Sequence, residues 1–279
     1  MSKISKALER AEQERLKRQE TSRRTPEFAA TVGAAVATET ATLEPAVPAP
    51  AQIVPEIAVD ERVLALFDPR SPVAEQYRIL RTNLLSLRNN KPIKVVMLSS
   101  AMHSEGKSVS CVNLAVTLAN DINKRKVLLI DADLRAGTTH QLLGMRPEIG
   151  LSDVLANNIP WTDALVSTPL SNLMVLPRGT TPPHPAELLS SNRMRQLMAE
   201  VRAEYDICLV DTPPIVPLSD PGIIGTLTDG AVIVIRGDRT QRTLVQYAIS
   251  LLTQANVQIL GTILTHAEGH TPEYLYRYF

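Results

Sequence analysis

Cysteine is scarce in this chain of 279 residues, which contains only Cys111 and Cys208. No spacing of cysteine and histidine has the form that is typical of a zinc site. Both cysteines lie within apolar stretches, and this placement favours reduced thiols in a cytosolic core over a disulfide. We therefore expect neither a disulfide nor a zinc centre.

Net charge and long apolar runs are also absent. The 29 lysines and arginines balance the 29 aspartates and glutamates, so the overall charge gives no reason to expect nucleic acid as a partner. No apolar run approaches the roughly 18 residues of a transmembrane helix, and the first residues carry charges where a signal peptide needs an apolar core. We expect a soluble, cytoplasmic protein.

Composition divides the chain into four parts. Residues 1–24 have the periodicity of an amphipathic helix and a charge of +4, from eight basic and four acidic side chains. This predicted helix has few large apolar residues, so docking on a partner protein, or simple solvation, is favoured over lipid binding. Residues 25–60, rich in Ala, Thr and Pro, are predicted to be a disordered linker. Residues 61–268 form the predicted folded domain, and residues 269–279 the predicted flexible tail.

The folded part alternates apolar strands with helical stretches. The apolar runs are continuous, which indicates burial on both faces and hence an α/β fold with a mainly parallel sheet and helices on either side. Ligands of such sheets bind at the carboxyl ends of the strands. The predicted strands are residues 94–100, 127–133, 173–178, 206–213, 231–237 and 258–265.

A polar loop follows the first of these strands and precedes a predicted helix. The sequence SSAMHSEGKS, residues 99–108, ends in the Gly-Lys-Ser of a phosphate loop. The loop departs from the full pattern, because Ala101 stands at the first glycine position and Ser104 at another position where many such loops have glycine. Taken alone, it could be a helix start with an incidental lysine. The residues predicted to bind a nucleotide are Ser104, Glu105, Gly106, Lys107, Ser108 and Val109.

Three aspartates stand at the ends of predicted buried strands. Asp131 and Asp133 end one strand, and Asp211 ends another. Each of them could simply cap a turn, but three carboxylates converging on a phosphate loop favour a Mg²⁺-nucleotide site. Asp220, before a proline, is instead predicted to cap the helix that follows. His140 could respond to the nucleotide or merely end a short turn.

A second predicted helix, residues 71–87, begins at Ser71 as its N-cap. Glu75, Arg78 and Arg81 follow at three-residue steps and therefore share one side of this helix. An exposed, internally paired face is one interpretation, and a contact between subunits is the other.

These motifs together resemble the bacterial tyrosine kinase (BY-kinase) family, and more narrowly the autokinases encoded with exopolysaccharide and exosortase loci. In the resemblance, SSAMHSEGKS is Walker A, LLIDADLR is Walker A′, ICLVDTPP is Walker B, and EQYRILR is the oligomerisation motif. The basic SKISKALERA helix is a separate match. The resemblance implies a P-loop NTPase fold and Mg-ATP as cofactor.

The resemblance also implies roles for individual residues. Lys107 and Ser108 would hold phosphate and Mg²⁺, Asp211 would act on the metal, and Asp131 and Asp133 would support the metal and the acceptor. Asp131 is the expected group that orients or deprotonates the attacking hydroxyl. The expected metal ligands are Ser108, Asp131 and Asp211, and the expected catalytic residues are Lys107, Asp131 and Asp133.

Assembly and regulation follow from the same resemblance. The helix with Glu75, Arg78 and Arg81 would build a ring-like homo-oligomer. The kinase would need a membrane partner of the chain-length-determinant type, which would hold it at the inner membrane and link it to exopolysaccharide polymerisation or export. Tail residues of the neighbouring subunit would be autophosphorylated in trans, namely Tyr274, Tyr276 and Tyr278.

The sequence departs from the family pattern at two further positions, and two alternative functions stay open. Gly137 replaces a proline that is usual in the family, and Thr265 stands where relatives commonly place an asparagine thought to read adenine. One alternative is a MinD/ParA-like ATPase that acts as a nucleotide-switched interaction protein. The loop before Gly106 lacks the additional lysine of that class. The other alternative is a scaffold that binds ATP without turnover.

Overall fold

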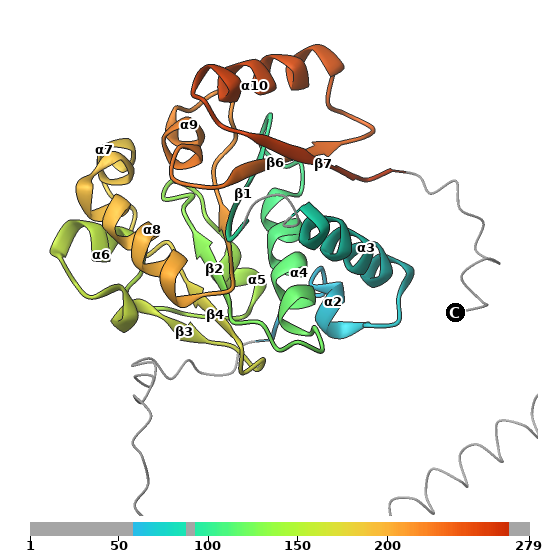
Figure 1. Ribbon diagram of the computed structural model, residues 1–279, viewed down its shortest axis with the longest axis horizontal. Coiled ribbons are helices and arrows are strands. Elements are labelled where there is room, and N and C mark those ends of the chain that lie inside the picture. Colours follow the sequence, from blue (N-terminus) through green and yellow to red (C-terminus); the bar gives the residue numbers. More distant parts are fainter. Residues whose placement is uncertain (1–57, 88–92, 268–279) are drawn as a thin grey trace, which may run out of the picture. The chain divides into compact units, whose positions relative to one another are not determined.

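A computed structural model describes residues 58–87 and 93–267 of the chain (Figure 1). The predicted N-terminal helix, most of the predicted linker and the tail tyrosines lie outside these residues. Within the described part, no helix is both long and apolar enough to cross a membrane. The strands are β1 (Val95–Ser100), β2 (Val127–Asp131), β3 (Val166–Ser167), β4 (Leu173–Leu176), β5 (Ile207–Asp211), β6 (Gly230–Arg236) and β7 (Ile259–Thr265). The helices are α2 (Leu64–Phe67), α3 (Pro72–Ser86), α4 (Lys107–Ala119), α5 (Thr139–Leu142), α6 (Leu151–Asn157), the 3₁₀ helix η2 (Trp161–Ala164), α7 (Pro185–Ser190), α8 (Asn192–Glu204), α9 (Asp220–Gly225) and α10 (Arg242–Gln254).

The sheet has the strand order β3-β4-β2-β5-β1-β6-β7. All pairs of neighbouring strands are parallel except β3 and β4, which are antiparallel. The α/β class and the mainly parallel sheet are therefore confirmed, and all six predicted strands are present. The two-residue β3 was not predicted, because two residues are too few to show a hydrophobic pattern.

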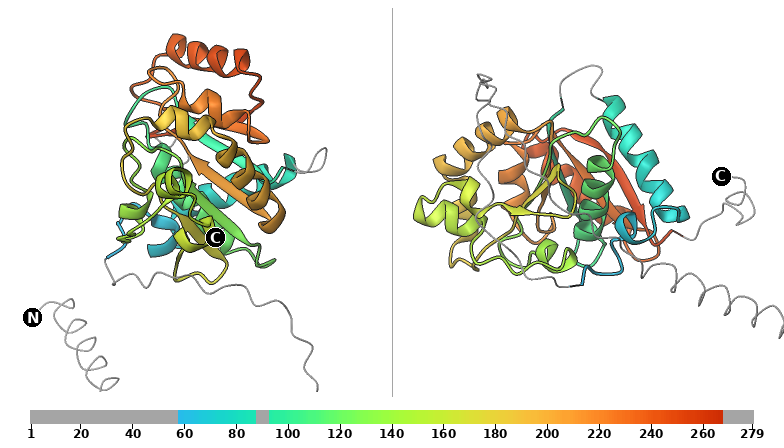
Figure 2. Two further views of the ribbon diagram at one scale, coloured as in Figure 1. Left: turned by 90° about the vertical axis from the view of Figure 1, so that its left-hand side faces the viewer. Right: turned by 90° about the horizontal axis from the view of Figure 1, so that it is seen from below.

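Helices cover both faces of the sheet. Alternate residues of β1 enter two different apolar clusters, with Val95 and Met97 in one and Val96 and Leu98 in the other. Helices α6 to α10 pack into the first cluster, and α2 to α5 pack into the second. Figure 2 (right) shows these two layers on opposite sides of the sheet. The continuous apolar sequence of the central strands thus reflects burial on both faces of the sheet, as expected.

Strand β7 is an exception to that pattern. Its sequence suggested burial on both faces, but none of its residues is fully buried and Leu264 is 60% exposed. The prediction was wrong for this strand because β7 is the last strand of the sheet, and among the described strands it pairs with β6 alone. The two cysteines do follow the prediction, since both are buried and free.

Helix α3 begins as the sequence predicts. The Ser71 hydroxyl accepts the backbone N–H of Ala74, and Pro72 occupies the first helical position. On its surface, Arg78 forms an ion pair with Glu75 within the same helix. Arg81 instead donates to the backbone oxygen of Thr117 in α4, at 3.1 Å. Part of this charged stripe is therefore engaged inside the chain.

A buried amide attaches the segment before α3 to the rest of the domain. Asn113 of α4 is 1% exposed. Its amide nitrogen donates to the backbone oxygens of Arg62 and Val109, both at 2.9 Å. Its amide oxygen accepts the backbone N–H of Ala65, also at 2.9 Å. One side chain thus positions α2, and through it the start of α3, against α4.

Replacing this amide tests its role in stability. Asn113→Ala should lower the free energy of unfolding by about 2 to 3 kcal/mol, because it leaves the buried Ala65 N–H without a partner and removes the bond to the Arg62 oxygen. Urea denaturation followed by circular dichroism measures the change. Asn83→Ala is the matched control, since Asn83 lies exposed on α3 and its loss should change stability by no more than about 0.5 kcal/mol. Equal effects of the two substitutions would contradict the proposed anchor.

Candidate active site

The phosphate loop connects β1 to α4 and has the backbone that its sequence suggests. Gly106 has φ +90° and is the N-cap of α4, so the helix starts at Lys107. Ser104 also has a positive φ, +63°, which costs a non-glycine residue about 1 to 2 kcal/mol. The first N–H groups of this 13-residue helix are free to meet an anion. Val109 lies in this first turn.

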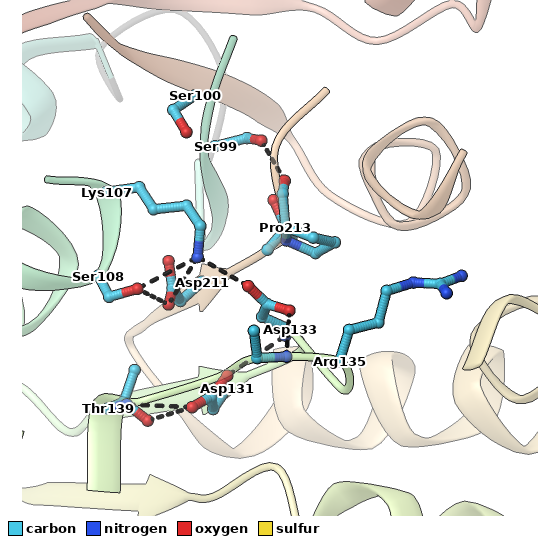
Figure 3. Close-up of polar contacts among 12 residues, drawn as sticks. Ser99, Ser100, Lys107, Ser108, Asp131, Asp133, Arg135, Thr139, Asp211 and Pro213 are labelled. Carbon is cyan, nitrogen blue, oxygen red and sulfur yellow. Dashed lines mark hydrogen bonds and ion pairs between the residues drawn. The ribbon is translucent and has the colours of Figure 1, made fainter. Parts of the chain in front are cut away.

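Lys107 lies among the predicted carboxylates (Figure 3). Its ammonium nitrogen is 2.9 Å from an Asp133 oxygen and 3.6 Å from an Asp211 oxygen. Burial alone would lower the pKa of Lys107, but the charges of Asp211 and Asp133 outweigh burial and raise it above its usual value. Lys107 therefore remains charged and meets the requirement for a phosphate-binding cation.

The aspartates that end β2 and β5 lie side by side. Asp131 and Asp211 are register partners in the parallel pair of strands and are both fully buried. Asp211 accepts the Ser108 hydroxyl at 2.6 Å. Asp131 accepts the hydroxyl of Thr139 at 2.7 Å and the backbone N–H of Thr139 at 3.1 Å. The structure thus brings together every carboxylate that the sequence assigned to this site.

Their environment favours protonation of one carboxyl group. Burial and the neighbouring charge of Asp211 raise the pKa of Asp131 to about 7, while the bonds from Thr139 oppose the rise. Burial also raises the pKa of Asp211, against the effect of Lys107. A carboxyl with a pKa near neutrality is suited to accept a proton during catalysis.

The donor set fits a magnesium ion that is bound together with a nucleotide. Oδ1 of Asp211 is buried and has no hydrogen-bond partner among the described residues, which leaves an oxygen available for a cation. Within those residues, no group of three or more His, Cys, Asp or Glu side chains is arranged to hold a metal by itself. Mg²⁺ usually takes one or two carboxylates and completes its shell with water and substrate phosphates, and the Asp211 carboxylate and the Ser108 hydroxyl are donors of that kind.

Contacts from distant parts of the chain support the phosphate loop. The Glu105 side chain is 3% exposed and accepts the Met102 N–H at 3.1 Å and the Thr240 hydroxyl. The Thr265 hydroxyl donates to the Glu105 backbone oxygen at 2.8 Å. The Glu105 carboxylate is therefore used to shape the loop, so only its backbone can face a phosphate. Sequence reasoning had noted Thr265 as a departure but missed Thr240, because no local pattern links residues so far apart.

Asp220, at the start of α9, is bound by Arg135 from the loop after β2. Asp220 was expected to cap α9, but its carboxylate is buried and makes no capping bond there. Both of its oxygens accept from Arg135, at 2.8 and 3.1 Å, because an unpaired buried carboxylate would be costly. At Gly137, a Cβ atom would lie 2.2 Å from an Asp131 oxygen. Glycine at this position therefore leaves the space that the Asp131 carboxylate occupies.

The ion pair between Lys107 and Asp133 predicts how a substitution affects nucleotide binding. Asp133→Asn should tighten the binding of ADP without Mg²⁺ by about tenfold, because the phosphates no longer compete with a carboxylate at 2.9 Å from Lys107. Isothermal titration calorimetry in EDTA measures the affinity. Glu204→Gln, which removes an exposed carboxylate from α8, is the control and should leave the affinity unchanged. Weaker binding by the Asp133 variant would show that this carboxylate supports rather than opposes phosphate.

The raised pKa of Asp131 predicts a pH-dependent stability. Its pKa in the folded protein, about 7, is above the ordinary 3.8, so the folded state binds this proton more tightly. The resulting stabilisation is complete below about pH 4 and is lost as the pH rises through about 7. Urea unfolding in EDTA should show that, between about pH 5 and about pH 8, the wild type loses more stability than Asp131→Asn. Parallel pH profiles for the two proteins would contradict the assignment.

Comparisons with known proteins agree with this site. A family model described as an AAA domain matches residues 93–250. The tyrosine-protein kinase YwqD of Bacillus subtilis is 39% identical over 206 residues, which cover 74% of this chain and 86% of YwqD. The putative tyrosine-protein kinase CapB of Staphylococcus aureus is 33% identical over 196 residues, covering 70% of this chain and 85% of CapB.

Solved structures give the same result. The kinase domain of the Escherichia coli tyrosine kinase ETK superposes with a TM-score of 0.69 and 32% identity, covering 75% of this chain and 83% of that domain. The septum site-determining protein MinD of Pyrococcus horikoshii, solved with Mg-ADP, superposes with a TM-score of 0.53 and 23% identity, over 66% of this chain and 76% of MinD. The likeness to MinD shows the shared fold alone. The matches to YwqD and CapB extend over most of each relative, and the chain therefore belongs to the family of bacterial tyrosine kinases.

Proposed function

We propose that the protein uses Mg-ATP to phosphorylate tyrosines in the tail of a neighbouring copy, and that this autophosphorylation regulates exopolysaccharide polymerisation or export. The observation that carries the proposal is the convergence of Lys107 and Ser108 with three buried carboxylates at the carboxyl ends of the central strands. Membership of the tyrosine kinase family supports it, and so does the run EYLYRYF at the end of the sequence. The tail itself lies outside the described residues.

The chain's own groups can supply most of what phosphoryl transfer requires. Lys107 and the N–H groups of the first turn of α4 would bind and orient the phosphates. Ser108 and Asp211 would hold Mg²⁺, which when bound neutralises charge on the transferred phosphoryl group. Asp131, positioned by Thr139, would accept the proton of the tyrosine hydroxyl as the new O–P bond forms and the bond to ADP breaks.

The charged stripe on α3 is proposed to contribute to a ring-like homo-oligomer. Glu75 and Arg78 are paired with each other at the surface, with their side chains 50% and 38% exposed, and Arg78 also donates to the Pro69 backbone oxygen. An exposed pair of this kind contributes little to the stability of one subunit, so exchanging partners with a neighbour costs little. Arg81 already contacts Thr117, and its part in the stripe would be to fix α3 on α4.

Membrane recruitment is proposed to depend on a partner rather than on this chain alone. The partner would be a membrane protein of the chain-length-determinant type, and residues 1–24 supply a basic segment for docking. The MinD/ParA-like alternative has less support, because those structures match at lower identity than the tyrosine kinases do. ATP-dependent dimerisation without phosphotyrosine would favour it nevertheless.

Loss of Lys107 provides the direct test of catalysis. Purified wild type incubated with Mg-ATP should acquire phosphate on Tyr274, Tyr276 or Tyr278, and Lys107→Ala should reduce it at least about a hundredfold, since a buried cation on the phosphates is lost. Phosphopeptide mass spectrometry measures the sites. Lys126→Ala, at an exposed lysine, is the matched control. Equal phosphotyrosine in wild type and Lys107→Ala would refute the proposal. It would also be refuted if the wild type acquired no phosphotyrosine even with the partner's cytoplasmic segment present.

Mixing two full-length variants tests whether transfer occurs in trans. A variant with all three tail tyrosines changed to phenylalanine keeps its active site, and Lys107→Ala keeps its tyrosines. Phosphate should appear on the Lys107→Ala chain only when both proteins are present. Its absence in the mixture, combined with normal activity of the wild type, would indicate transfer within one chain.

A further inference from the structure

A positively charged pocket lies beside the catalytic carboxylates. It has a volume of about 420 Å³ and is lined by His140, Arg146 and Arg178 together with backbone near Gly144 and Gly179. His140 directly follows Thr139, whose hydroxyl binds Asp131. Arg178 follows β4, and β4 is the strand next to β2. The pocket residues therefore lie past the carboxyl ends of the parallel strands, as the active site does.

Two of the lining residues each have a side-chain nitrogen without a hydrogen-bond partner in the described part of the chain. Nε of Arg178 and Nδ1 of His140 are both buried without a partner. Another nitrogen of Arg178 donates to the Thr181 hydroxyl at 3.1 Å, which fixes the guanidinium in place. Arg146 is exposed.

The charge of the lining is of one sign. No aspartate or glutamate is among the lining residues, so neither guanidinium has a carboxylate within the pocket. The proximity of Arg178, after the larger effect of burial, lowers the pKa of His140. An anionic group entering the pocket would meet two arginines, which bind carboxylates with paired, charge-assisted hydrogen bonds.

We propose that this pocket receives an acidic side chain adjacent to the acceptor tyrosine, and that the kinase therefore selects acidic tyrosyl peptides. The inference rests on the proposed kinase function and adds its substrate class. The chain itself supplies a fitting occupant, because Glu273 directly precedes Tyr274 in the tail. A tyrosine directed at Asp131 would lie next to Thr139, and the following residue, His140, lines the pocket.

Two synthetic peptides test the preference. Both carry residues 268–279 with Tyr276 and Tyr278 changed to phenylalanine, and one also carries Glu273→Gln. Full-length wild type should phosphorylate the glutamate peptide with a KM about tenfold lower and a similar kcat, because the lost contact is a charge-assisted hydrogen bond. Equal KM values for the two peptides would overturn the proposal.

A charge exchange locates the contact. Arg146→Glu should raise the KM for the glutamate peptide by about tenfold or more and should favour a third peptide with Glu273→Lys. Arg242→Glu makes the same change at an exposed residue at the start of α10 and should leave both KM values unchanged. The pocket assignment is wrong if Arg146→Glu weakens all peptides equally.

A binding measurement separates this inference from the proposed function. Fluorescence anisotropy of the labelled peptides, with full-length protein and Mg-ADP, should show the same charge preference as the kinetics. Charge-dependent binding without any phosphorylated peptide would uphold the pocket while refuting the kinase proposal. Phosphorylation with no charge dependence in either measurement would refute the pocket assignment while upholding the kinase proposal.

Discussion

The ammonium group of Lys107 lies among three carboxylates that the sheet buries, and the active site depends on this charge balance. Asp131 and Asp211 end adjacent parallel strands, so their positions follow from the topology itself. One lysine cannot neutralise three buried carboxylates, and the excess negative charge makes the site a place where a cation is stabilised. Burial, together with the neighbouring charge of Asp211, raises the pKa of Asp131, and one oxygen of Asp211 has no hydrogen-bond partner among the described residues.

The sequence was sufficient to predict the central strands and the residues at their carboxyl ends. Continuous apolar runs identify buried parallel strands, and a polar residue directly after such a run must lie at the carboxyl end of its strand. This reasoning predicted that Asp131 and Asp211 end two strands and converge, and the structure has them as register partners. It failed for β7, where an equally apolar run forms an exposed edge strand, because strand order is not written in the local pattern.

The residues that support the site were harder to predict, since each acts across a large separation in sequence. Thr240 and Thr265 bind Glu105 from 135 and 160 residues away. Asp220 had an adequate local role as a helix cap, but the structure uses it as the buried partner of Arg135, 85 residues away. Local chemistry indicates which side chains need a partner, whereas only the tertiary fold determines which partner they find.

The hydrogen bond from Thr265 to the phosphate loop also fixes the point from which the chain continues toward the tail tyrosines. Thr265 is the last residue of β7, and Tyr274 follows it by nine residues along the chain. A fully extended chain spans at most about 3.3 to 3.6 Å per residue, so the Cα atom of Tyr274 can lie no farther than about 32 Å from that of Thr265. For transfer between copies, this covalent limit sets the greatest spacing at which one subunit's first tail tyrosine can enter its neighbour's active site.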